Sequence, residues 1–190
     1  MNQDLENLWL PRSATALVVV DVQQRLVLAM EPAIYRRILG KLRLLVAAAE
    51  VLALPAIFTE QYPAGLGTTV AELLPDGAPV IEKTTFSCCG APKFVAALEE
   101  RQIRHILLCG MEAHVCVYQT LLDLRRRGYV VHLAADAISS RNKIDYRMAL
   151  DNARRAGATV TTTEAALFQM LGDSKAAEFR AISALIKECG

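Results

Sequence analysis

The chain of 190 residues is long enough for one domain with a sizeable core, and its 53% hydrophobic and 22% charged residues are typical of a globular protein rather than a disordered one. The formal net charge is +1, so no acidic or basic field points to nucleic acid or an anionic membrane as a partner. No stretch approaches the roughly 20 apolar residues that span a bilayer, and five irregularly spaced cysteines favour reduced thiols, so we expect a single cytoplasmic domain over residues 1–190.

The first half of the chain alternates short apolar runs with longer amphipathic ones. ALVVVD (residues 16–21) has no polar alternation, which is typical of a strand buried on both faces. Residues 33–54 have a stripe of apolar side chains at helical spacing. We then expect a strand at 56–59, a Pro/Gly-rich loop at 62–67 and a short strand at 79–82.

The second half of the chain continues the same alternation. We expect helices at 93–101, 114–127, 145–156, 164–170 and 174–187, and strands at 105–109, 129–134 and 159–161. Gly128 closes the second of these helices as its C-terminal cap. Strands that alternate with helices imply right-handed crossovers and a parallel sheet covered by helices on both faces. The fold class is therefore α/β, with three layers and a Rossmann-like topology.

Three reactive residue types stand at or just after the ends of predicted strands. Asp21 ends the first strand, Lys83 follows the strand at 79–82, and Cys116 lies just after the strand at 105–109. Ligands of such folds bind outside the carboxyl ends of the strands. A thiol acts as a nucleophile when its proton is removed, which a nearby cation and a helix N-terminus favour and a carboxylate can accomplish. Each residue also has an ordinary alternative: a helix-capping aspartate, a solvated lysine and a small buried cysteine.

Three motifs in order extend this pattern to a known family. ALVVVDVQ, EKTTFS and GMEAHVCV together resemble the isochorismatase-like hydrolases, also called the cysteine hydrolase superfamily. The resemblance runs from about residue 15 to residue 170 and includes DAISSR and TTTEAALF. Within the superfamily, TEQYPAGLG and EAHVCV look most like the isochorismatase-domain-containing branch.

The resemblance implies a fold and an activity. It implies a six-stranded parallel sheet, assembly into dimers or larger homo-oligomers, and a catalytic triad of Asp21, Lys83 and Cys116. Members hydrolyse small non-peptide C–N bonds through the cysteine, whereas the ether-cleaving isochorismatases lack that cysteine. Retention of Cys116 therefore favours hydrolysis of an amide or carbamoyl bond through a thioester. The family also implies a cis Met111–Glu112 peptide bond that aims backbone N–H groups at an oxyanion.

The same resemblance argues against a metal. Nicotinamidases carry an aspartate and two histidines after the second strand, but residues 59–69 here offer only Glu60. We therefore expect no metal and no other cofactor, with a small molecule as the substrate. Candidate residues of the substrate pocket are Gln23, Tyr62, Phe86, Ser87 and His114, although Gln23 is equally well an ordinary polar loop residue.

Other functions stay open at the level of sequence. A catalytically silent scaffold would keep the fold without needing the triad, and a thiol-redox protein would use Cys88, Cys89 and Cys116. Adjacent cysteines rarely form a disulfide without strain, so two free thiols are expected at Cys88 and Cys89. A dinucleotide enzyme is disfavoured because no GxGxxG follows the first strand. Asp136 and Arg141 are interpreted as residues that fix a loop or an interface.

Overall fold

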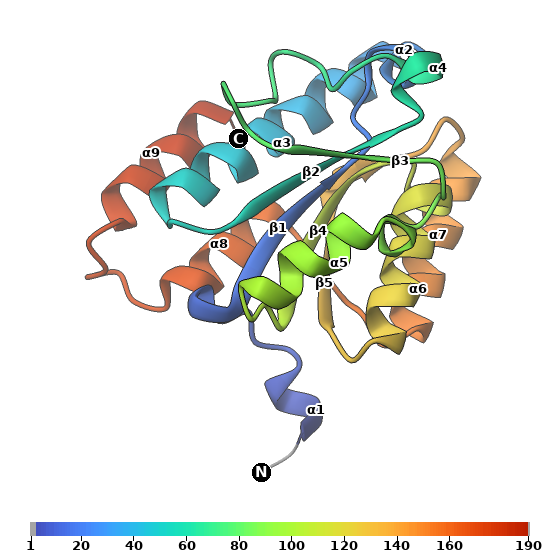
Figure 1. The fold of residues 1–190 in the computed structure, drawn as a ribbon. Coiled ribbons are helices and arrows are strands. Elements are labelled where there is room, and N and C mark those ends of the chain that lie inside the picture. Colours follow the sequence, from blue (N-terminus) through green and yellow to red (C-terminus); the bar gives the residue numbers. More distant parts are fainter. Residues whose placement is uncertain (1–2, 190) are drawn as a thin grey trace.

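Six parallel strands form one sheet in the computed structural model, which describes residues 3–189 (Figure 1). The strand order is β3-β2-β1-β4-β5-β6, the doubly wound order of two βαβαβ halves. The α/β class and the six-stranded parallel sheet expected from the sequence are both confirmed. The strands are β1 (Thr15–Val20), β2 (Ala56–Gln61), β3 (Val80–Lys83), β4 (His105–Met111), β5 (Val130–Ser139) and β6 (Thr159–Thr161).

Helices cover both faces of this sheet (Figure 1). One layer contains α3 (Pro32–Val51), α8 (Thr163–Leu171) and α9 (Phe179–Cys189), and the other contains α5 (Pro92–Glu100), α6 (Tyr118–Arg126) and α7 (Lys143–Arg155). The short helices are α1 (Gln3–Glu6), α2 (Gln24–Val27), α4 (Pro63–Leu66), η1 (Arg12–Ala14), η2 (Cys88–Gly90) and η3 (Ala113–Val117). Among residues 3–189, no helix combines the length and the apolar character needed to cross a membrane.

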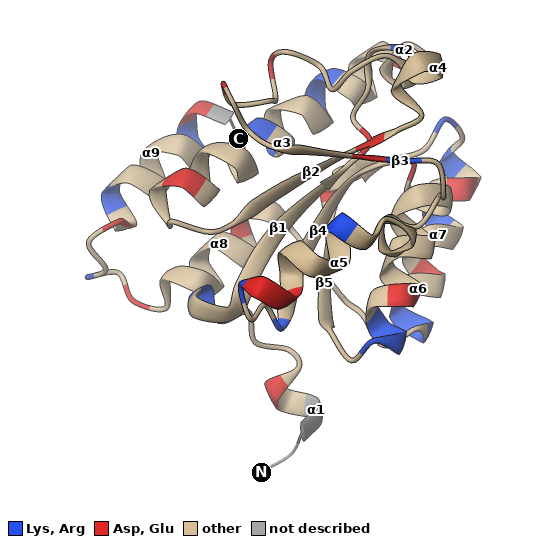
Figure 2. Cartoon of the chain, in the orientation of Figure 1, with Lys and Arg blue, Asp and Glu red and all other residues tan. Residues whose placement is uncertain are grey.

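The core lies between the sheet and the two helix layers. All six residues of β1 are buried, as its unbroken apolar run predicts for a central strand covered on both faces. The predicted stripe of α3 is buried at Ile38, Leu42, Leu45 and Ala49. Figure 2 shows that the charged residues are concentrated on the helices and loops, with few on the strands. Burial of apolar area, at about 25 cal/mol per Å², is therefore the main force holding the three layers together.

Several predicted boundaries differ from the structure for local reasons. The predicted helix at 174–187 begins only at Phe179, because the Asp173 side chain accepts a hydrogen bond from the Lys175 backbone and holds a turn instead. The predicted loop at 62–67 contains the single turn α4. β5 runs five residues beyond its predicted end, past a register shift between Leu108 and Gly110 on β4.

The strand order places the reactive residues together. β1 lies between β2 and β4. The strand order reverses at β1, because β2 and β3 follow one another outward on one side and β4, β5 and β6 on the other. The carboxyl ends of β1, β3 and β4 therefore open onto one crevice. Val20 is in register with Thr59 on β2 and with Gly110 on β4, and Gln61 on β2 is in register with Lys83. The residues that follow these positions form the candidate site.

Candidate active site

Asp21 is held at the centre of the site by residues of β2 and β3. It directly follows β1, has a left-handed backbone (φ 49°) and is fully buried. Its N–H donates to Thr59 O at 3.2 Å, and its Oδ1 accepts a 2.7 Å hydrogen bond from Thr59 Oγ1. Its Oδ2 accepts from Lys83 Nζ at 2.6 Å, in an ion pair whose two side chains are wholly buried. A buried carboxylate needs partners of this kind to retain its charge.

Lys83 is surrounded by acceptors from its own loop. Its ammonium donates to Gln61 Oε1 at 2.9 Å, to Phe86 O at 3.0 Å and to Thr85 O at 3.3 Å, in addition to Asp21. The spacing within EKTTFS has a simple cause, because the loop turns back so that the carbonyls two and three residues after the lysine reach its ammonium. Four acceptors share the three N–H groups of this ammonium, so none of its N–H groups is left to bind a ligand.

Cys116 lies in the middle of the π-helical turn η3, and 6% of its surface is exposed. Burial raises the pKa of its thiol well above the ordinary range, and the charge of Asp21 raises it further, whereas Lys83 opposes the shift. A hydrogen bond to Asp21 also raises this pKa. Lys83 thus acts in the direction expected from the sequence, but burial and Asp21 outweigh it, so the resting thiol is neutral.

The turn before Cys116 has the predicted backbone. The Met111–Glu112 peptide bond is cis. Gly110 has φ 111°, and a Cβ at this position would lie 2.1 Å from Val20 O, so only glycine lets β4 approach β1 this closely. The N–H groups of Val115 and Val117 both donate to Glu112 O, at 3.1 and 3.2 Å.

Asp136 and Arg141 fix loops, as interpreted from the sequence. The Asp136 carboxylate accepts from Thr163 N at 2.8 Å and from Thr163 Oγ1 at 2.9 Å, at the start of α8. Arg141 donates from its backbone and from Nε to the buried Glu112 side chain, at 3.1 and 3.0 Å. Arg141 thereby anchors the residue that follows the cis bond, and its charge is paired.

The pocket candidates separate into buried and exposed residues. Gln23 is fully buried, and its amide bonds the backbone of Gln61 and Gly67 rather than Asp21, so it holds the loop after β2 and faces no pocket. Ser87 is also buried and accepts a hydrogen bond from Cys89 N. Tyr62 and Phe86 are 58% and 53% exposed. Two exposed aromatic side chains, Tyr62 and Phe86, therefore border the site.

His114 is the partly exposed member of η3. Its Nδ1 lies 2.9 Å from Ser140 Oγ, and its Nε2 lies 3.9 Å from a carboxylate oxygen of Asp145 at the start of α7. These contacts tie η3 to α7. His114 stays a prediction as a pocket residue.

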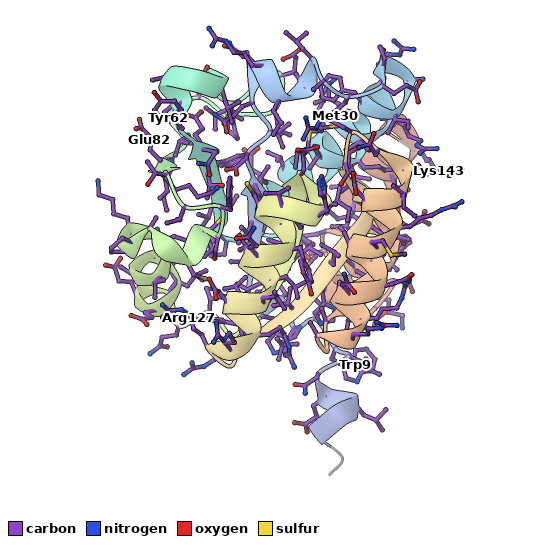
Figure 3. The ribbon with its side chains drawn as sticks, turned by 90° about the vertical axis from the view of Figure 1, so that its right-hand side faces the viewer. Trp9, Met30, Tyr62, Glu82, Arg127 and Lys143 are labelled. Carbon is purple, nitrogen blue, oxygen red and sulfur yellow. The ribbon has the colours of Figure 1, made fainter. Side chains whose placement is uncertain are left out.

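An open cleft of about 820 Å³ runs along the free edge of β3. Lys83, Thr84 and Thr85 line it, and Tyr62 and Glu82 lie together on this side of the molecule in Figure 3. Cys116 is not among its lining residues. The cleft thus borders the site from the lysine side without containing the thiol.

Three residues around Asp21 and Lys83 were not assigned to the site from the sequence. Thr59 and Gln61 bond Asp21 and Lys83 from β2, and Cys88 lies 3.6 Å from Thr59 Oγ1 through its sulfur. Thr59 and Gln61 alternate at the carboxyl end of β2, the strand next to β1. That position was the only clue available, because polar residues at a strand end have many ordinary uses.

Glu60, the one acidic residue that the sequence offers in residues 59–69, has a hydrogen-bond partner. Its Oε1 accepts a 2.6 Å hydrogen bond from Thr69 N, so the one acidic side chain in residues 59–69 is already engaged. Among the residues that the structure describes, no three His, Cys, Asp or Glu side chains gather in a way that would hold a metal ion. The thiols of Cys88, Cys89, Cys109 and Cys116 are free.

Comparisons with known proteins agree with this architecture. Residues 15–165 match the family model described as the Isochorismatase domain. Isochorismatase domain-containing protein 2 from Bos taurus is 41% identical over 155 residues, which cover 81% of this chain and 75% of the relative. The protein of the same name from Homo sapiens is 44% identical over 141 residues, covering 74% and 68%.

Solved structures with the same fold carry several names. The MAR1 ribonuclease from Caenorhabditis elegans has a TM-score of 0.88 and 37% identity, covering 94% of this chain and 92% of that one. The YcaC gene product from Escherichia coli, described as an octameric hydrolase of unknown specificity, has a TM-score of 0.83 and 25% identity, covering 96% and 89%.

Proposed function

Because this chain belongs to the isochorismatase domain family, and so to the hydrolases of the cysteine hydrolase superfamily, we propose that it hydrolyses a small amide or carbamoyl C–N bond. The bond would be cleaved through a thioester on Cys116. One observation carries the proposal: a single buried carboxylate, Asp21, is paired with the Lys83 ammonium at 2.6 Å and lies near enough to the Cys116 thiol to raise its pKa. That arrangement supplies a nucleophile, a base and a counter-charge at one point.

The first half of the reaction is an acyl transfer to sulfur. Asp21 takes the Cys116 proton as the sulfur attacks the carbonyl carbon, so negative charge moves from the carboxylate to the carbonyl oxygen. The tetrahedral adduct then collapses, the C–N bond breaks, and the protonated Asp21 returns that proton to the leaving nitrogen. The product is an amine or ammonia, with the acyl group held on Cys116.

The second half of the reaction repeats these steps with water as the nucleophile. Asp21 takes a proton from water, the hydroxide oxygen adds to the thioester carbon, and the C–S bond breaks. The sulfur regains the proton from Asp21, which releases the acid and restores the neutral thiol. Lys83 stays charged throughout, because its three N–H groups have permanent acceptors and its role is to hold Asp21 in place.

Backbone amides of η3 are the proposed donors for the oxyanion. Val115 N–H and Val117 N–H are engaged by Glu112 O, so the proposed donor is Cys116 N–H between them. A preorganised donor of this kind is worth roughly 10²- to 10³-fold in kcat.

The charge pattern favours a neutral substrate. All three N–H groups of Lys83 are used inside the protein, and Arg141 already has a carboxylate partner in Glu112. This is the reason for ranking amides above a vinyl-ether substrate that carries carboxylates.

Ribonuclease activity is a second candidate, favoured by the name of the MAR1 structural relative. Phosphodiester cleavage needs a cation to stabilise the phosphorane charge. Because the Lys83 ammonium is saturated by its acceptors, the geometry supports this candidate less well than amide hydrolysis. Incubation of the protein and its Cys116→Ser variant with a short single-stranded RNA tests it directly.

We also propose a homo-oligomer, in line with the octameric YcaC relative. On the last helix, Leu185 and Ile186 pack partly buried against the core of their own chain. Exposed apolar side chains elsewhere, including Phe86 and Ile144, leave other faces for assembly. Sedimentation that shows only a 20.8 kDa species at micromolar concentration would refute this.

The decisive experiment is a screen of small neutral amides and carbamoyl compounds with trapping of the intermediate. Acid quench during turnover should give a Cys116 peptide heavier by the mass of the acyl group, by peptide mapping. The Cys116→Ser variant should show no thioester, while Cys109→Ala, which removes a remote buried thiol, should behave as the parent protein does. Turnover with an unmodified Cys116 peptide would disprove the thioester mechanism.

A further inference from the structure

A chain of buried hydrogen bonds continues beneath the Asp21 carboxylate. Thr59 is 1% exposed, and its hydroxyl bonds Asp21 Oδ1 at 2.7 Å. The sulfur of Cys88, which is fully buried, lies 3.6 Å from the same hydroxyl oxygen. None of the steps above uses either residue.

The direction of this chain follows from the number of hydrogens. An ionised carboxylate only accepts, so the single hydrogen of Thr59 Oγ1 must point to Asp21. The Cys88 thiol is then the donor to Thr59. Burial raises the pKa of Cys88 to about 12, so its sulfur keeps the hydrogen that this role requires.

The chain is also anchored to the helix that carries the nucleophile. Cys88 N donates to Thr120 Oγ1 at 2.9 Å, and Thr120 lies four residues after Cys116. The hydrogen bonds therefore connect β2, η2 and α6 around one carboxylate oxygen. Side chains locked in this way are what hold a reacting group within a few tenths of an ångström of its working position.

We propose that Thr59, supported by Cys88, is a positioning residue for the general base of this site. In the resting protein its hydroxyl holds Oδ1 of the Asp21 carboxylate. When Asp21 holds the proton taken from Cys116, that proton faces the sulfur and the leaving nitrogen, and the Thr59 hydroxyl still donates to another lone pair of Oδ1. Both protonation states of Asp21 then keep a partner at Oδ1. This inference rests on the proposed function, because it assigns Asp21 the role of base.

The test compares Thr59→Val, which keeps the shape and removes the hydroxyl, with Thr59→Ser, which restores a hydroxyl. With an amide substrate found by the screen, Thr59→Val should lower kcat about 10- to 100-fold, the range for losing a hydrogen bond to a charged group. KM should change less than threefold, and Thr59→Ser should recover most of kcat. Thr69→Val is the matched control, since Thr69 is a buried threonine whose hydroxyl has no partner among the described residues, and its kcat should equal that of the parent.

Cys88 provides a second, weaker arm. Cys88→Ala should lower kcat by a few fold, whereas Cys109→Ala, which empties a similar buried volume but whose sulfur bonds Val18 O rather than Thr59, should not. The proposal is overturned if Thr59→Val keeps kcat within twofold of the parent protein, or if Thr59→Ser loses as much as Thr59→Val.

A substrate-independent readout separates this proposal from the proposed function. Iodoacetamide alkylation of Cys116, followed by peptide mapping, also requires removal of the thiol proton. Thr59→Val should slow it about tenfold and Thr59→Ser should restore it. Failure of every amide in the screen would count against the proposed function alone, whereas equal alkylation rates in all variants would overturn the positioning role.

Discussion

At the carboxyl end of the sheet Asp21 and Lys83 are buried as charges, whereas at the amino end His132 is buried and His105 partly buried, and burial disfavours the charge of both rings. The charged pair has acceptors and donors on every side. In the histidine pair, whose ring centroids are 6.4 Å apart, His105 Nδ1 and His132 Nε2 have no partner among the described residues. Figure 3 shows Trp9, which lies next to this pair in the fold, at the opposite end of the molecule from Tyr62.

The difference shows two solutions to burying an ionisable group. Burial lowers the pKa of His132 to about 4, with a further contribution from His105, and burial likewise lowers the pKa of His105. Those rings simply lose their charge, which suits a structural end of the sheet. A base and its counter-ion need their charges, so the dense polar network at the carboxyl end is what the proposed function requires there.

The largest effect should come from breaking the charged pair. Lys83→Met leaves the Asp21 charge buried without its cation, which should cost about 3–5 kcal/mol of unfolding free energy and abolish turnover. Urea unfolding of the variant measures the loss. Adding Asp21→Asn to Lys83→Met removes the stranded charge, so the double variant should be more stable than Lys83→Met alone. Equal stability of the single and double variants would contradict the buried-charge explanation.

A second comparison uses glycines with positive φ at the two ends of the sheet. Gly110→Ala would place a Cβ 2.1 Å from Val20 O, so β1 and β4 must separate, and we expect a loss of more than about 3 kcal/mol together with lower activity. Gly128→Ala, before β5 at the amino end, meets open space at φ 86° and should cost about 1–2 kcal/mol from backbone strain alone. Thermal unfolding of both variants tests the ranking, and the reverse order would show that the close approach at Gly110 is dispensable.

The sequence predicted the scaffold and the three reactive residues, but not the groups that support them. Apolar runs specify buried strands, and motif spacing brings Asp21, Lys83 and Cys116 to one edge. The raised pKa of Cys116 and the contacts of Thr59 depend on burial and on register between strands far apart in the chain. Gln23 shows the same limit, because its position after Asp21 suggested the pocket, whereas its amide binds backbone groups of a neighbouring loop.

The amino end of the sheet, with His132, should make folding stability sensitive to acid. His132 has an ordinary pKa near 6.5 when unfolded and about 4 when folded, so between these values the unfolded chain binds more protons. Stability is then fully present above about pH 6.5 and falls as pH decreases toward 4, by about 3 kcal/mol in total. His132→Leu should flatten this part of the stability curve, measured by urea unfolding from pH 4 to 7. His114→Gln, which alters a partly exposed histidine, should leave the slope as it is, and an equal slope in His132→Leu and the parent would contradict the assignment.

The smallest expected effect concerns metal removal at the carboxyl end of the sheet. Residues 59–69 provide one acidic side chain, Glu60, and its Oε1 already accepts from Thr69 N, while Gln61 is committed to Lys83. A metal ion there would have to displace both hydrogen bonds, and the positive charge beside Asp21 is supplied by the lysine instead. Dialysis against a strong chelator should therefore leave amide turnover unchanged, and added zinc should not raise it. Loss of turnover on chelation, with recovery on adding zinc or iron, would mean that this loop rearranges to bind a metal and that Lys83 is not the sole cation of the mechanism.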